Sequence, residues 1–134
     1  MRKIGFIGAG NMGMAIARGM VSASLSLPES IVVYDVFEDK QSEAKKFGFQ
    51  LAESAAALCA ECDLIVFAVK PQTLESVLQS IAGYVKQLET KLFITIAAGI
   101  SISFIQSYLG NECKVVRVMP NTPLMIGKGA RVRV

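Results

Sequence analysis

The chain has 134 residues, enough for one domain with a hydrophobic core. Hydrophobic residues make up 52% of the sequence and charged residues 19%, a balance that argues against a disordered protein. The net charge is only +3, and the basic residues form no cluster, so we expect no nucleic-acid partner. Histidine is absent, which removes the usual acid–base catalyst and metal ligand, and we expect no metal site.

Short apolar stretches and three cysteines indicate the compartment. No apolar run reaches the roughly 20 residues needed to span a bilayer, so we expect no membrane partner. Without a recognisable signal peptide, we predict a cytoplasmic protein with reduced thiols at Cys59, Cys62 and Cys113. Cys59 and Cys62 form a C-x-x-C pair, but this pair falls at the end of a predicted helix, where a packing role is favoured over zinc or redox chemistry.

Hydrophobic periodicity predicts strands and helices that alternate along the chain. The predicted strands are residues 3–7, 30–35, 49–51, 63–69, 91–97 and 114–119, with a last β-like piece at 130–134. The predicted helices are residues 12–23, 38–47, 53–62, 71–88 and 101–109. Pro71 suits the first position of its helix, and Ser101 suits an N-cap.

This alternation predicts an α/β fold of the Rossmann type, with a doubly wound, mostly parallel sheet and helices on both faces. We expect residues 1–134 to form one domain. The sequence ends within a strand-like run that has no cap or tail, so we also expect it to be part of a longer protein.

Residues 8–13 read GAGNMG, a G-x-G-x-x-G motif between the first predicted strand and the first predicted helix. In that context Gly8 permits a tight turn, Gly10 lets the backbone approach a pyrophosphate, and Gly13 lets the helix pack close to the strand. The backbone N–H groups at the helix start then face the phosphates. The alternative is a glycine-rich turn that binds nothing, but the strand–turn–helix context favours a dinucleotide-binding domain.

Asp35 follows Gly13 by 22 residues and ends the second predicted strand. A carboxylate at this place binds the ribose 2′-hydroxyl and repels a 2′-phosphate, and residues 36–38 include no Arg to receive that phosphate. On charge alone this favours NADH over NADPH. The alternative is a solvated strand-end Asp that leaves both cofactors usable, with Lys40 or a backbone amide compensating.

Ligands of such sheets bind outside the carboxyl ends of the strands, so the loops that begin at Lys70, Ala97 and Pro120 are expected to converge. The small residues Ala97, Ala98 and Gly99 would let a nicotinamide ring approach the backbone. Lys70 is equally explained as a surface lysine, and residues 121–122 as a turn between two prolines.

Four segments together resemble the N-terminal half of the pyrroline-5-carboxylate reductases: IGFIGAGNMG, FAVKPQ, ITIAAGIS and VVRVMPNTPLMIGKGA. GAGNMG is shared with many β-hydroxyacid dehydrogenases, whereas AVKP and MPNTP are far more specific. The resemblance implies that the C=N bond of 1-pyrroline-5-carboxylate is reduced to proline with NADPH or NADH. It also implies a set of cofactor-binding residues: Ile7, Gly8, Ala9, Gly10, Asn11, Met12, Asp35, Ala68, Val69, Lys70, Pro71 and Ala98.

The same resemblance implies that Asn121, Thr122 and Pro123 form the floor near the transferred hydride. Two departures from the family stand out. Ala55 lies in a stretch where the family commonly has an Asn that contacts the adenosine side, and the helical half that builds the dimer and binds substrate is absent from the chain. We therefore expect a homo-oligomer only for a full-length protein, catalytic groups outside this chain, and weak or no turnover by the chain alone.

Two alternatives share these features. One is another imine reductase or a β-hydroxyacid dehydrogenase on the same scaffold, whose catalytic residues would also lie outside the chain. The other is a regulatory relative that binds a dinucleotide without catalysis. MPNTP favours the pyrroline-5-carboxylate reductase interpretation over both.

Overall fold

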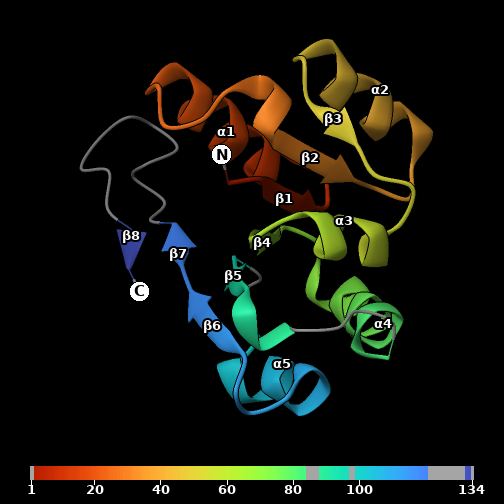
Figure 1. Cartoon of the computed structure of the whole chain (residues 1–134), viewed down its shortest axis with the longest axis vertical. Coiled ribbons are helices and arrows are strands. Elements are labelled where there is room, and N and C mark those ends of the chain that lie inside the picture. Colours follow the sequence, from red (N-terminus) through yellow and green to blue (C-terminus); the bar gives the residue numbers. More distant parts are fainter. Residues whose placement is uncertain (1, 84–87, 97–98, 121–131, 134) are drawn as a thin grey trace.

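The computed structural model describes residues 2–83, 88–96, 99–120 and 132–133. Strands and helices alternate along the chain from β1 to β6 (Figure 1). The strands are β1 (Ile4–Ile7), β2 (Ile31–Tyr34), β3 (Gln50–Leu51), β4 (Leu64–Phe67), β5 (Leu92–Thr95), β6 (Lys114–Arg117), β7 (Met119–Pro120) and β8 (Val132–Arg133). The α-helices are α1 (Asn11–Ser22), α2 (Glu38–Lys46), α3 (Ala55–Glu61), α4 (Pro71–Ala82) and α5 (Ile102–Leu109), with 3₁₀ turns η1 (Pro28–Ser30) and η2 (Leu88–Thr90).

Six strands form one sheet in the order β3-β2-β1-β4-β5-β6, and every pair in it is parallel. β1 lies in the middle, with Ile4 opposite Ile31 on one side and Leu64 on the other. The chain therefore builds the sheet outward from β1 in one direction and then returns to build it in the other. This confirms the predicted Rossmann-type α/β fold.

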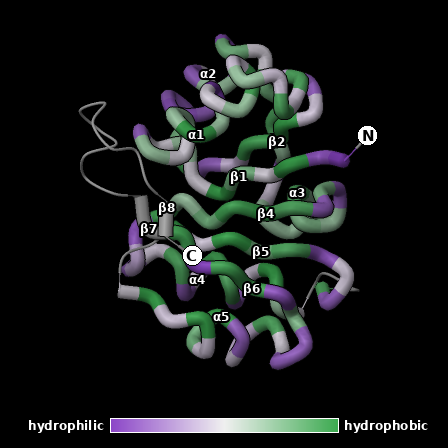
Figure 2. The backbone as a smooth tube through the Cα atoms, turned by 90° about the vertical axis from the view of Figure 1, so that its left-hand side faces the viewer, coloured by the Kyte–Doolittle hydropathy of each residue, from purple (hydrophilic) through white to green (hydrophobic). Residues whose placement is uncertain are grey.

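Two cores cover the two faces of the sheet. Phe6 of β1 and Val66 of β4 share one buried cluster with Met14 and Ala17 of α1. Their neighbours Ile7 and Phe67 belong to the other cluster, which includes buried residues of α3, α4 and α5. Successive residues of a strand face opposite sides, so a strand covered on both faces is apolar throughout, as β4 is in Figure 2.

The boundaries of several elements differ from the prediction. Helix α4 ends at Ala82 rather than at about residue 88, because Gly83 follows as its C-cap, and Leu88 instead belongs to η2. The strands predicted at 63–69 and 91–97 are shorter at both ends, although backbone bonds from Ala68 and Ile96 continue the ladder by one residue. The strand predicted at 114–119 is divided into β6 and β7.

The last predicted β piece contains β8, which pairs antiparallel with β7 as a separate two-stranded sheet. Among the helices of the described residues, none has the length and apolar character to cross a bilayer.

All three cysteines are buried free thiols, which agrees with the packing role expected of the C-x-x-C pair. Burial in apolar surroundings raises the pKa of Cys59 and of Cys62 to about 12, and it also raises the pKa of Cys113. Neutral thiols of this kind are poor nucleophiles.

Candidate functional site

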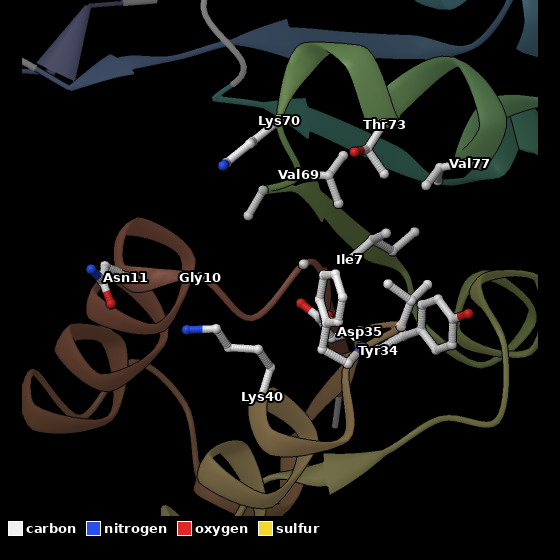
Figure 3. Close-up of a pocket in the computed structure, with 14 residues that line it drawn as sticks. Ile7, Gly10, Asn11, Tyr34, Asp35, Lys40, Val69, Lys70, Thr73 and Val77 are labelled. Atoms are coloured by element: carbon white, nitrogen blue, oxygen red, sulfur yellow. Dashed lines mark hydrogen bonds between the residues drawn. The ribbon is translucent and has the colours of Figure 1, made fainter.

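A cleft of about 640 Å³ lies at the carboxyl ends of β1, β2 and β4, where the strand order reverses (Figure 3). Open parallel sheets bind their ligands in this crevice. It is lined by residues from the ends of β1 and β2, the glycine loop, helix α2, the β4–α4 loop and helix α4: Ile7, Gly8, Gly10, Asn11, Tyr34, Asp35, Val36, Phe37, Lys40, Ala68, Val69, Lys70, Thr73 and Val77.

Gly8 makes the sharp turn from β1 into the cleft. Its φ of +106° lies in a region that L-residues rarely adopt, and a Cβ there would lie 2.7 Å from the carbonyl carbon of Ala68. Its N–H donates to the carbonyl of Tyr34 at 2.8 Å. The turn is thus held between the ends of β2 and β4.

Gly10 and Gly13 serve different contacts. A Cβ on Gly13 would lie 2.8 Å from the Cβ of Ala68, so this glycine allows α1 to pack closely against the end of β4. Nothing lies within 4 Å of the place where a Cβ on Gly10 would stand, so its backbone is open to the cleft. No side chain caps α1, and no acidic residue stands in its first turn.

The N-terminal turn of α1 therefore presents backbone donors at the cleft, together with the positive end of the helix dipole. An open glycine backbone next to such a turn fits the pyrophosphate of a dinucleotide.

Asp35 joins two loops that border the cleft. Its carboxylate accepts a hydrogen bond from the Ala9 N–H at 2.7 Å and another from the Phe37 N–H at 2.9 Å. Its backbone carbonyl accepts a bond from the Gln41 side-chain amide at 2.5 Å. One bond reaches the glycine loop and two reach the segment from the end of β2 into α2, so Asp35 sets the spacing between them.

Three charged side chains line the cleft among the described residues: Asp35, Lys40 and Lys70. Lys40 comes from α2, and Lys70 is the N-cap residue of α4. In Figure 3 their amino groups approach from opposite sides, with Gly10 between them. Because the Asp35 carboxylate already accepts two backbone N–H bonds, the lysines make this end of the cleft favourable for an anion.

Most of the residues implied by the family resemblance line this cleft. Ala9, Met12 and Pro71 do not: Ala9 is buried and contributes its N–H to Asp35, Met12 is half-buried in α1, and Pro71 begins α4. Ala98, Asn121, Thr122 and Pro123 lie outside the described residues, as does the expected nicotinamide end.

The structure adds lining residues that the sequence reasoning missed, notably Tyr34, Thr73 and Val77. Tyr34 immediately precedes Asp35 at the end of β2. Thr73 and Val77 follow Lys70 at intervals of three and four residues, which places them on one face of α4. That helical spacing is a signal from which both residues were predictable once Lys70 was singled out.

Two relatives illustrate the sequence similarity of the chain. The pyrroline-5-carboxylate reductase of Methanosarcina acetivorans is 39% identical over 130 residues, covering 96% of this chain and 47% of that protein. The pyrroline-5-carboxylate reductase of Escherichia coli K12 is 39% identical over 129 residues, again covering 96% of this chain and 47% of that protein. The chain thus spans about half the length of these relatives.

Solved structures share the fold as well as the sequence pattern. Plasmodium falciparum pyrroline carboxylate reductase with NADP bound superposes with a TM-score of 0.79 at 36% identity, covering 98% of this chain and 48% of that one. A pyrroline-5-carboxylate reductase from Coxiella burnetii superposes with a TM-score of 0.83 at 30% identity, covering 93% and 46%.

The parallel sheet, its strand order and the glycine loop in its central crevice define an NAD(P)-binding domain of the Rossmann type. A family model described as "NADP oxidoreductase coenzyme F420-dependent" matches residues 3–99, more than half of the chain. The chain belongs to this family, and within it to the pyrroline-5-carboxylate reductases, whose N-terminal, NAD(P)-binding half it represents.

Proposed function

We propose that this chain is the cofactor-binding half of a pyrroline-5-carboxylate reductase, which transfers a hydride from NADPH or NADH to the C=N carbon of 1-pyrroline-5-carboxylate and so forms proline. The observation that carries the proposal is the crevice itself, with a complete glycine loop in a chain that is 39% identical to such reductases over 96% of its length. The substrate assignment rests on the names of the relatives.

The described residues have binding and positioning roles in this proposal. Gly8 and Gly13 allow the loop and α1 to lie close against Ala68, and the open backbone at Gly10 admits the pyrophosphate. Val69 in the β4–α4 connection and Thr73 in the first turn of α4 form the wall on the other side of the cleft. When bound, the nicotinamide supplies the hydride. The whole enzyme must hold that ring and the substrate in line and limit access of water, and the half represented here would contribute the cofactor side of that arrangement.

The proposed division of labour places the substrate groups elsewhere. Asn121, Thr122 and Pro123 are proposed to lie near the transferred hydride. The groups that bind the substrate carboxylate and protonate its nitrogen are proposed to belong to a helical half of the kind that full-length family members carry. That half would also form the homo-oligomer, so the chain alone is expected to bind the cofactor with little or no turnover.

Calorimetric titration of the chain with NADPH and NADH, alongside an assay for proline formation, tests the proposal. We expect saturable binding of at least one dinucleotide and proline formation only when the chain is joined to the C-terminal half of a reductase such as the Escherichia coli protein. Absence of binding to both dinucleotides contradicts the proposal. Binding without proline formation by the joined protein would favour a regulatory relative or a reductase of another substrate.

A further inference from the structure

Two charged side chains, Asp35 and Lys40, line the end of the cleft beside β2. The Asp35 carboxylate is occupied by hydrogen bonds from the backbone. Both oxygens of the Asp35 carboxylate accept backbone N–H bonds, at 2.7 Å from Ala9 and 2.9 Å from Phe37. A carboxylate held in this way has part of its charge compensated by the two N–H dipoles. It therefore repels a nearby phosphate less than the solvent-facing strand-end Asp that the sequence suggests.

Lys40 lies on the first turns of α2 and points from there into the cleft, as Figure 3 shows. Its side chain is half-buried against the cleft wall. Within the described residues, no carboxylate lies within ion-pair distance of its amino group. Glu38 and Asp39 on the same helix are exposed and do not line the cleft, so the charge of Lys40 is available to a ligand there.

Position in the fold identifies the ligand group that Lys40 would meet. In a Rossmann-type domain the dinucleotide crosses the end of β1 with its pyrophosphate on the glycine loop, and its adenosine ribose lies by the end of β2. The residues that follow β2 therefore surround the ribose 2′ position. An ammonium group there binds a phosphate much more strongly than a neutral hydroxyl, because the contact with phosphate is a charge-assisted hydrogen bond between opposite charges.

We propose that Lys40 makes this cleft selective for NADPH by pairing with its 2′-phosphate, while Asp35 is a positioning residue that holds the glycine loop. This inference rests on the proposed dinucleotide-binding function and reverses the NADH preference that charge at Asp35 suggests from sequence alone. The proposal thus assigns the choice between NADPH and NADH to Lys40, and assigns to Asp35 only the positioning of the glycine loop.

The first test replaces Lys40 and measures dissociation constants for NADPH and NADH by calorimetry at constant ionic strength. We expect the unmodified chain to bind NADPH more tightly, and Lys40→Gln to weaken NADPH binding by about tenfold or more, the size of a lost charge-assisted hydrogen bond. NADH binding should stay within about twofold, since NADH lacks the 2′-phosphate with which Lys40 would pair. Lys40→Arg should retain most of the NADPH affinity.

A matched control is Lys45→Gln, which removes the same charge from an exposed position of the same helix that does not line the cleft. This variant should leave both affinities unchanged, which excludes a general effect of net charge. Loss of NADPH and NADH affinity in equal measure in Lys40→Gln, or no loss of either, overturns the assignment of Lys40. So does tighter binding of NADH than of NADPH by the unmodified chain.

The second test is Asp35→Asn, which keeps the shape of the side chain but replaces one acceptor oxygen by an N–H₂ donor. If Asp35 positions the loop, this variant should weaken NADPH and NADH binding to the same degree. A selective gain in NADPH affinity would instead mean that Asp35 repels the 2′-phosphate, and would overturn its positioning role.

If the unmodified chain binds neither dinucleotide, the proposed function fails and this inference with it. If it binds both and the variants do not discriminate, only this inference fails.

Discussion

Gly8 and Gly10 lie two residues apart in the same loop, yet they meet different constraints. The φ of +106° at Gly8 and the backbone of Ala68 beside it leave no room for a side chain. Gly10 has an extended backbone, with φ of −74°, and open space around it. The glycine at one position is required by the fold, whereas the glycine at the other is explained only by a ligand.

This contrast predicts different outcomes for the two alanine variants. Gly8→Ala should lower the free energy of unfolding by about 2–4 kcal/mol, from left-handed backbone strain and overpacking against Ala68. Gly10→Ala should cost no more than about 1 kcal/mol, the usual difference between glycine and alanine at a helix N-cap. It should nevertheless weaken dinucleotide binding by about tenfold, because its Cβ stands where the pyrophosphate approaches. Urea denaturation and calorimetric titration check the pair, and a Gly10→Ala chain with unaltered binding would contradict the pyrophosphate assignment.

At the scale of elements, helices are positioned by single small residues and by their caps. Helix α3 packs against β1 at Gly5, where a Cβ would lie only 2.2 Å from the Leu58 Cδ2. Ser54 begins α3 by accepting a bond from the Ala57 N–H at 3.0 Å, and Ser101 begins α5 by accepting one from the Phe104 N–H at 3.1 Å. The cap at Ser101 was predicted from sequence, whereas the close approach at Gly5 was not, because it joins two elements distant along the chain.

Replacing Gly5 of β1 and Gly19 of α1 by alanine should change the free energy of unfolding in opposite directions. Gly5→Ala should cost about 1–3 kcal/mol of stability by forcing α3 away from β1. Gly19 lies on the exposed surface of α1, and nothing lies within 4 Å of the place where its Cβ would stand, so Gly19→Ala should stabilise by about 0.5–1 kcal/mol. Thermal or urea unfolding of the two variants measures the difference, and destabilisation by both would show that α1 is packed differently.

Loss of either serine cap should weaken the helix that it begins. We expect Ser54→Ala and Ser101→Ala each to reduce the free energy of unfolding by about 1 kcal/mol, because each leaves an N–H of the first helical turn without its side-chain acceptor. Ser76→Ala is a suitable control, since Ser76 lies within α4 and its hydroxyl donates only to the Thr73 carbonyl. Equal stability of all three variants would contradict a capping role.

At the scale of the whole molecule, one of the two cores keeps all three thiols neutral and out of solvent. Cys59 and Cys62 belong to the core on the side of α3, α4 and α5, and burial raises the pKa of each to about 12 from the ordinary value of 9.0. Ionisation is easier in the unfolded chain, so their contribution to stability is complete below pH 9 and is lost as the pH rises toward 12.

We therefore expect the native chain to react slowly with a thiol reagent at pH 8, and all three cysteines to react readily in urea. A colorimetric thiol assay on the native and unfolded chain measures both rates. Labelling of Cys62 in the native chain at the rate of a free cysteine would contradict its buried, neutral state.

Much of the fold was predictable because its signals are local. The apolar runs of β4 and β5, the alternation of strands with helices and the context of Gly8–Gly13 all lie within short stretches of sequence. The main errors fell at element ends such as Gly83, where cap geometry and tertiary packing decide the last turn. The sequence did not predict that Tyr34 lines the cleft, because an aromatic residue at the end of a strand can pack in the core or face a cleft equally well.

The sequence by itself determined the class of fold, the glycine loop and the edge of the sheet where a ligand binds, because periodicity and turn chemistry act over a few residues. Only the tertiary structure shows which hydrogen bonds the charged groups at that edge already make. Ala9 and Asp35 lie 26 residues apart, and their hydrogen bond exists because β1 and β2 are neighbours in the sheet. The direction of Lys40 likewise depends on how α2 packs, and so the interpretation of Asp35 as a simple ribose ligand changes once the structure shows what its carboxylate already holds.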